Sequence, residues 1–198
     1  MNKINSESKL ILKYIIRKKI TPSKYQSKDW RKSQIWYQGG KKNECELYQR
    51  NLIETITNKK CLKTNERIHM DKNEIINESR PMKREDAFSW TEDFDGKQQF
   101  SENIILYYNL KMVCESGGGQ TRTLREVSHF IRSQLEYNKK YIHHPKYFVN
   151  ILDGNESSKL IEKFNYILNN EKYKYIKNFI FVGDMVSFFN WFHQLNVQ

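Results

Sequence analysis

The chain has 198 residues, enough for one domain with a sizeable core, and its 12 Tyr, 11 Phe and 4 Trp exclude a disordered chain. It contains no run of 18 apolar residues, no signal peptide and no CxxC motif among its three cysteines, so we expect a reduced, cytoplasmic protein without a membrane span or structural zinc. The net charge of +11 arises within residues 1–85, which hold 21 Lys and Arg against 10 Asp and Glu, and this asymmetry favours a polyanion partner.

The N-terminal part, residues 1–80, is basic and is predicted to be mainly helical. Residues 6–20 show an apolar stripe at helical spacing and a basic last turn, and Thr21-Pro22 ends this helix. A second helix is predicted over residues 44–60, after a basic and aromatic segment that closes at Gly39-Gly40. Residues 58–85 are polar without a clear period, so we expect a loop or linker there. This part is expected to contact DNA or to build a dimer.

The C-terminal part, residues 81–198, alternates strands with helices. Strands are predicted over residues 87–95, 104–114, 147–153 and 178–183, with a turn at Gly96 after the first. Helices are predicted over residues 120–137, 157–170 and 184–195, the last with Asp184 as its N-cap. This alternation predicts an α/β fold in which a central mixed β-sheet is flanked by helices.

An acidic cluster, Glu92, Asp93 and Asp95, lies where the first predicted strand ends. Carboxylates this close repel one another unless a cation lies among them, and Mg2+ prefers oxygen ligands of this kind. The alternative is a solvated turn, because Asp-Gly is a common turn sequence. Asp153, in a second Asp-Gly pair, is predicted to be a strand-end turn residue.

Asn109 and Lys111 lie on the next predicted strand, on one face and about 6–7 Å apart. A lysine in this place can orient or deprotonate a water molecule, or stabilise charge on a phosphate. The alternative is a surface lysine on a half-exposed strand.

Three glycines, Gly117 to Gly119, precede the helix that follows this strand. They permit close approach of the backbone, and the free N–H groups of the helix favour a phosphate, although the sequence is not a Walker loop. Arg122 and Arg125 lie one turn apart and can pair with phosphate oxygens. Glu126 either pairs with Arg122 or completes a metal site. The glycines otherwise serve only the geometry of a turn.

The acidic strand end, the Asn109-Leu110-Lys111 stretch and the polar helix start together resemble the PD-(D/E)xK nuclease superfamily over about residues 87–155. The resemblance implies a restriction-endonuclease-like core in which Asp95, or Asp93, binds Mg2+ with help from Asn109, and Lys111 is the catalytic lysine. Gln120 would be the polar residue that such nucleases place on the following helix. Residues 92–131 are also similar to type II restriction endonucleases of the DpnII/MboI kind, which cut at GATC.

The resemblance implies Mg2+-dependent hydrolysis of double-stranded DNA by a homodimer, because a palindromic cut requires two-fold symmetry. The sequence departs from the superfamily at Asn109, where a carboxylate is expected, so Glu92, Glu115 or Glu126 would supply the second acid. Two other classes stay open. One is a non-catalytic nucleic-acid-binding module with a degenerate nuclease fold, and the other is a protein-interaction domain whose charge reflects coding bias.

The residues expected to contact DNA come from both parts of the chain. Cations supply salt-dependent affinity for phosphates. The aromatic residues interleaved with the N-terminal cations, Trp30 and Trp36 among them, either stack on unpaired bases or pack this region onto the core. The candidates are Lys28, Arg31 and Lys32 in the N-terminal part and Gln120, Thr121, Arg122 and Arg125 on the helix.

Overall fold

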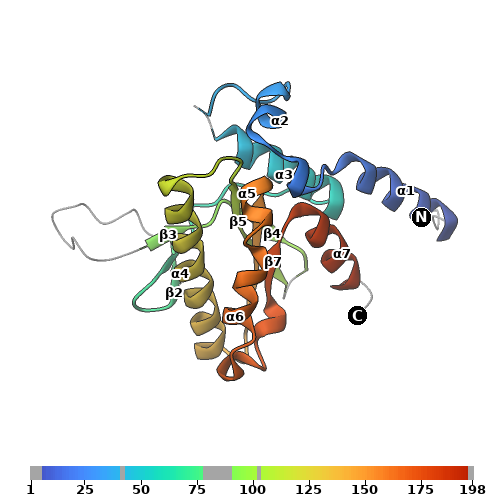
Figure 1. Ribbon diagram of the computed structural model, residues 1–198. Helices are drawn as coiled ribbons and strands as arrows, with labels where there is room; N and C mark the ends of the chain where they lie inside the picture. Colours follow the sequence, from blue (N-terminus) through green and yellow to red (C-terminus); the bar gives the residue numbers. More distant parts are fainter. Residues whose placement is uncertain (1–5, 41–42, 78–90, 102–103, 196–198) are drawn as a thin grey trace.

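A four-stranded mixed sheet forms the centre of the protein (Figure 1). The computed structural model describes residues 6–40, 43–77, 91–101 and 104–195. The strands are β4 (Gly96–Gln99), β5 (Ile105–Met112), β6 (Tyr147–Asp153) and β7 (Ile180–Gly183), in the order β4-β5-β6-β7. The β4/β5 pair is antiparallel, whereas β5/β6 and β6/β7 are parallel. The prediction of a mixed α/β sheet is confirmed.

A second, three-stranded antiparallel sheet has the order β2-β1-β3. Its strands are β1 (Arg67–His69), β2 (Glu74–Ile76) and β3 (Thr91–Asp93). The prediction of an unstructured stretch over residues 58–85 was therefore wrong for β1 and β2. Strands of three residues are too short to show a period of two, and they are held by pairing with each other and with β3.

Gly96 is the first residue of β4, so the prediction of a turn at this glycine was also wrong. A Cβ atom at this position would lie 2.7 Å from the Cys61 Sγ atom. The glycine thus permits the close approach of a neighbouring side chain to the strand.

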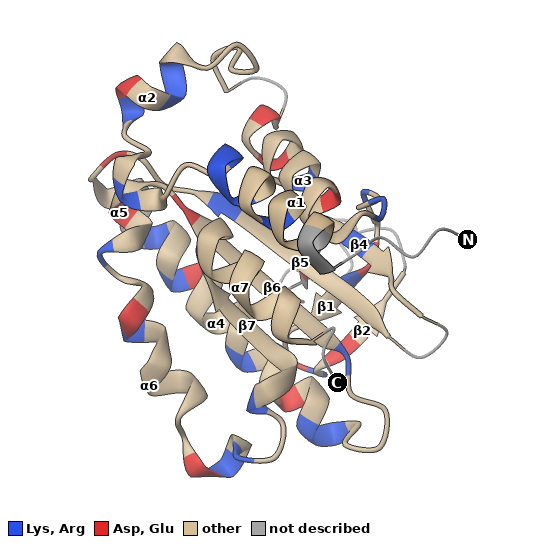
Figure 2. Ribbon diagram, turned by 90° about the vertical axis from the view of Figure 1, so that its right-hand side faces the viewer, with Lys and Arg blue, Asp and Glu red and all other residues tan. Residues whose placement is uncertain are grey.

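Helices cover both faces of the central sheet (Figures 1 and 2). The long crossover helix α4 (Gly118–Lys140) packs on one face, where Val127 and Ile131 meet Tyr107 and Phe148 of the sheet. On the other face, α3 (Glu44–Thr57), α7 (Met185–Leu195) and the C-terminal end of α1 (Ser6–Lys19) share a second apolar cluster with the strands. Alternation of side chains along β5 and β6 feeds both clusters.

The helices predicted over residues 6–20, 44–60, 120–137 and 184–195 are confirmed by α1, α3, α4 and α7. Asp184 caps α7, because the Ser187 backbone N–H donates to the Asp184 Oδ1 atom at 2.8 Å. Two short elements, a 3-10 turn (Ser23–Tyr25) and α2 (Lys28–Ser33), lie between α1 and α3.

The helix predicted over residues 157–170 is broken into short pieces. These are α5 (Asn155–Ser158), a 3-10 turn (Ile161–Phe164) and α6 (Asn165–Leu168), with further 3-10 turns at Glu171–Tyr173 and Lys177–Phe179 before β7. Ile161, Phe164 and Ile167 all contact the α4-side cluster, and their spacing of three is the period that a 3-10 turn aligns on one side.

The predicted domain boundary at residue 80 lies outside the described residues. On either side of it, the N-terminal and C-terminal parts pack together, since Ile53 and Ile56 of α3 share one cluster with Leu106 and Leu110 of β5. Over the ranges that the structure describes, no helix is long and apolar enough to cross a membrane.

Candidate functional site

Asp95 and Lys111 meet at the junction of β4 and β5. The antiparallel register pairs Gly96 with Tyr108, which places Asp95 next to the end of β5. The Lys111 Nζ atom lies 3.2 Å from the Asp95 Oδ2 atom, and the Leu110 backbone N–H donates to the same oxygen at 2.7 Å. Two residues selected from the sequence, 16 positions apart, are thus in direct contact.

The ammonium group of Lys111 is partly shielded from solvent, and its partner Asp95 is more so. Burial opposes the charge on the lysine, but attraction and hydrogen bonding from Asp95, with weaker attraction from Glu46 and Glu92, raise the pKa of Lys111 above its ordinary value. Lys111 therefore stays protonated near neutral pH. It is suited to stabilising negative charge or orienting a water molecule, and not to removing a proton.

Glu46, on α3, is a site residue that the sequence analysis missed. Burial raises the pKa of its carboxyl group, and the negative charge of Asp95 raises it further, while Lys111 and Arg50 oppose this. The two carboxylates are thus close enough to influence each other's charge. Nothing in the sequence marks Glu46, because a glutamate in the first turn of a helix is ordinary.

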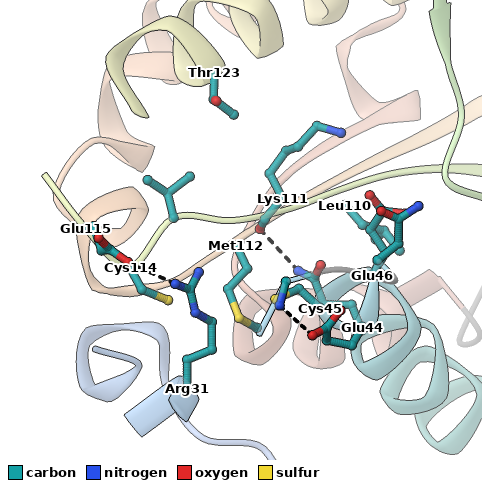
Figure 3. Close-up of a pocket in the computed structure, with 14 residues that line it drawn as sticks. Arg31, Glu44, Cys45, Glu46, Leu110, Lys111, Met112, Cys114, Glu115 and Thr123 are labelled. Atoms are coloured by element: carbon teal, nitrogen blue, oxygen red, sulfur yellow. Dashed lines mark hydrogen bonds and ion pairs between the residues drawn. The ribbon is translucent and has the colours of Figure 1, made fainter. Parts of the chain in front are cut away.

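A pocket of about 350 Å³ opens beside Lys111, between the end of β5, the start of α3 and the first turns of α4 (Figure 3). Its apolar wall includes Met112 and Val113. One edge of the loop before α3 is fixed by Glu44, whose Oε1 atom accepts from the backbone N–H groups of Gln38 at 2.9 Å and Gly40 at 2.6 Å. The polar residues that line the pocket include Arg31, Glu46, Gln49, Lys111, Glu115 and Thr123.

The other members of the acidic cluster take different places. Asp93, on β3, forms an ion pair with the buried Arg67 on β1, with an Oδ1–Nε distance of 3.3 Å. Glu92 contributes to the field that raises the pKa of Lys111. The cluster is therefore divided, and of its three carboxylates Asp95 is the one in contact with the lysine.

Asn109 lies on β5 as expected, but its side chain is buried within a network of amides. Its Nδ2 atom donates to the Asn150 Oδ1 atom at 3.0 Å, and Gln134 of α4 exchanges two further hydrogen bonds with Asn150. Asn109 is 2% exposed. Its amide thus joins β5 to β6 and α4 in the interior.

Several predicted DNA-contacting cations are paired with acids in the structure. Lys28 and Arg31 both bind Glu115, at 2.8 Å and 3.0 Å, at the rim of the pocket. These pairs lower the pKa of Glu115, chiefly through the hydrogen bond from Lys28. Lys32 is exposed on α2.

On α4, the Arg122 Nε atom lies 2.8 Å from the Glu126 Oε1 atom, which is the salt bridge considered for this pair. Arg125 is exposed on the same helix. Gln120 and Thr121 lie in the first turn of α4, and their side chains are outside the described set.

The tryptophans of the N-terminal region pack against α3. The rings of Trp36 and Tyr48 stack with centroids 4.5 Å apart, and Trp30 meets both edge-on at 6.2 Å. Of the two uses considered for these aromatic residues, the structure shows the packing one.

Asp153 forms a second polar junction, at the end of β6, and has no exposed surface. Its Oδ1 atom accepts from the Ser23 hydroxyl at 2.9 Å and from the Met185 backbone N–H at 3.1 Å. Its Oδ2 atom accepts from the Gln49 Nε2 atom at 2.9 Å, which also donates to the Lys111 carbonyl oxygen at 3.2 Å. Burial raises the pKa of Asp153 to about 6, although the hydrogen bonds from these donors oppose the shift. The predicted turn residue thus joins four segments of the chain.

Magnesium could be held by the carboxylates beside Lys111. Asp95 and Glu46 offer hard oxygen donors, and Mg2+ commonly uses one or two protein carboxylates together with waters and substrate phosphate. The raised pKa of Glu46 beside Asp95 is what crowded carboxylates show when no cation lies between them. Among the residues that the structure describes, no group of three His, Cys, Asp or Glu side chains is placed to hold a metal ion by itself. The donor set fits a metal that shares its ligands with water and substrate.

Comparison with known proteins gives no match to a protein-family model, to a curated protein or to a solved structure.

Proposed function

We propose that the protein is a Mg2+-dependent endonuclease that hydrolyses the phosphodiester bonds of double-stranded DNA, and that its sheet is a restriction-endonuclease-like core. The observation that carries the proposal is the contact between Lys111 and Asp95 across two antiparallel strands, with the Glu46 carboxylate close to both. The resemblance to the PD-(D/E)xK superfamily supports it, since an acid at a strand end and a lysine on the next strand are its elements.

Asp95 and Glu46 are the proposed metal-binding residues. The hydrogen bond from the Leu110 N–H fixes the orientation of the Asp95 carboxylate before any ligand arrives. Bound between these residues, a Mg2+ ion would supply positive charge beside the scissile phosphate. Glu46 here takes the place of the second acid that the sequence lacks at Asn109.

Lys111 is the proposed catalytic cation. Because its pKa is raised, its ammonium group donates hydrogen bonds and stabilises the negative charge that develops on the phosphate during hydrolysis. Its attachment to Asp95 holds it beside the metal-binding acids.

Double-stranded DNA is the proposed substrate because cations surround the pocket. Lys28, Arg31 and Lys32 lie on one side, and Arg122 and Arg125 lie on α4 (Figure 2). Contacts of this kind supply phosphate affinity that falls with salt. A type II restriction enzyme specific for GATC is the finer form of the proposal, and the sequence of the fragment ends would test it.

A second candidate function is a nucleic-acid-binding module without catalysis. The buried position of Asn109 favours it, because the residue that replaces the expected carboxylate serves the interior of the protein. The two candidates differ in whether the Lys111–Asp95 pair acts on a phosphate.

The deciding experiment is cleavage of plasmid and genomic DNA with Mg2+ by the wild-type protein and by Asp95→Ala, Lys111→Ala and Glu46→Gln. We expect discrete fragments from wild type, and a loss of at least roughly a hundredfold in each variant and with EDTA. The matched control is Lys140→Ala, since Lys140 also pairs with a glutamate but lies in the last turn of α4.

Retained cleavage by Lys111→Ala would place the chemistry elsewhere. Salt-sensitive DNA binding by a wild-type protein that never cleaves would leave the binding module as the function.

A further inference from the structure

Large apolar side chains are concentrated on the surface of α1. Within the part of the chain that the structure describes, the other exposed large apolar residues are separated from one another, as is normal for a soluble protein. On α1, five lie within six positions and are between 46% and 67% exposed: Leu10, Ile11, Leu12, Tyr14 and Ile15. We call these five the α1 patch. A contiguous patch of this kind marks a surface that contacts something.

The end of α1 that follows the patch is fixed to the body of the protein. Ile16 and Ile20 belong to the cluster that α3 and α7 form with the sheet, and Ile20 is buried. Beyond the helix, Ser23 is tied to Asp153, and Gln26 accepts from the Gly154 N–H at 2.9 Å. The patch therefore extends from an anchored base, and α1 projects away from the rest of the molecule in Figure 1.

The size of the patch suits the centre of a protein–protein interface. Taking about 200 Å² for each large side chain, the five residues expose roughly 600 Å². A stable interface buries on the order of 800 Å² on each partner, with an apolar centre and a polar rim. The α1 patch supplies most of such a surface from a single helix.

The charges on α1 favour an antiparallel arrangement of two identical helices. Arg17, Lys18 and Lys19 are gathered in the last turn. Antiparallel pairing puts this basic turn beside the N-terminus of the partner helix, whereas parallel pairing would bring the two basic turns together. A two-fold axis across the patch brings Ile11 and Ile15 of each helix to the same seam, because they lie one turn apart.

A membrane surface fits the patch less well than a second protein does. A helix that lies in a membrane interface has one apolar face. Leu10 and Leu12 are both exposed, although two positions along a helix turn the side-chain direction by about 200°. A second copy can contact a projecting helix from more than one side.

We propose that the α1 patch is the contact surface of a homodimer, in which the α1 helices of two copies pack antiparallel. This goes beyond the nuclease proposal and does not depend on it. It would supply the two-fold partner that a palindromic cut requires.

The test is sedimentation equilibrium of the full chain without DNA or Mg2+, so that the result is independent of cleavage. We expect a dimer that dissociates on dilution, and a dissociation constant at least roughly a hundredfold weaker in the Ile11→Gln/Ile15→Gln variant. Glutamine keeps helix propensity, and both positions are exposed in the single chain, so the variant should unfold at the wild-type temperature. The matched control is Tyr166→Gln/Tyr175→Gln, which removes two exposed apolar side chains from another region.

Three results would overturn the proposal. They are a wild-type protein that is monomeric at every concentration, a dimer that is insensitive to the α1 substitutions, and a monomer that binds anionic lipid vesicles through α1.

Discussion

Two Asp-Gly corners of this protein have the same dipeptide and different surroundings. At Asp95-Gly96, the carboxylate meets the ammonium of Lys111 beside an open pocket. At Asp153-Gly154, the carboxylate has no exposed surface and accepts hydrogen bonds from the neutral groups of Ser23, Gln49 and the Met185 backbone. The groups that face the aspartate, and not the dipeptide itself, decide whether it is held as half of an ion pair or as an interior acceptor.

The largest expected effect separates the two corners by activity. Under the nuclease proposal, Asp95→Asn should lower the rate of DNA cleavage by at least roughly a thousandfold, because it removes a metal-binding charge. Asp153→Asn should lower it by less than about tenfold, because Asp153 does not line the pocket. Cleavage rates under conditions where both variants are folded will check this. Equal losses would show that the corners act as one site.

The next effect separates the corners by the space around each glycine. Gly154 has φ +98°, and a Cβ atom there would overlap the backbone carbonyl of Val113, so Gly154→Ala should cost more than about 3 kcal/mol of unfolding free energy. A Cβ atom at Gly96 meets the Cys61 side chain, which can move, so Gly96→Ala should cost about 1 kcal/mol. Urea denaturation measures both, and similar midpoints would mean that the Gly154 backbone is less constrained than the structure shows.

The third effect is a dependence of stability on pH that only the buried corner should have. The pKa of Asp153 rises from its ordinary 3.8 to about 6 on folding, so the folded state favours the protonated carboxyl. Its contribution is full below pH 4 and is lost as the pH rises through 6, a change of about 3 kcal/mol. We expect the difference in unfolding free energy between wild type and Asp153→Asn to follow this curve, while the difference for Asp95→Asn does not. A flat difference for Asp153→Asn would contradict the raised pKa.

The smallest effect concerns Gln49, which connects the corners through Asp153 and the Lys111 carbonyl. Gln49→Met keeps the length of the side chain but removes both donors, and should cost about 1–2 kcal/mol. Loss of a donor should also raise the pKa of Asp153 further. Thermal unfolding at two pH values will check this against Gln194→Met, an exposed control on α7. A Gln49→Met protein with wild-type stability would show that the connection contributes nothing.

Much of the fold could be predicted because the periodic segments are long. The apolar positions of α4 and the apolar runs of β5 and β6 show their structure within single windows of sequence. β1 and β2 could not be found, since three residues carry no measurable period and their pairing with β3 is a tertiary contact.

The candidate site was only partly visible in the sequence. Asp95 and Lys111 were recognised from residue type and order, but their contact depends on the β4/β5 register, which the sequence does not display. Glu46 is brought to the corner by packing of α3 on the sheet, and a lone glutamate on a helix gives no signal of that. The interior role of Asn109 likewise depends on Asn150 and Gln134, on other elements.

The partners of Asp153 also set the order in which the molecule can be assembled. Ser23 is made 130 positions before Asp153, Gln49 104 positions before it, and Met185 32 positions after it. A chain emerging from the ribosome therefore carries α1 and α3 with their apolar surfaces uncovered until the last parallel strand has been made. Contacts so distant along the chain slow folding and lengthen the exposure of aggregation-prone surface, so we expect folding to be late and dependent on chaperones. For a nuclease, the same delay would keep the nascent chain harmless to the DNA of its own cell until synthesis is nearly complete.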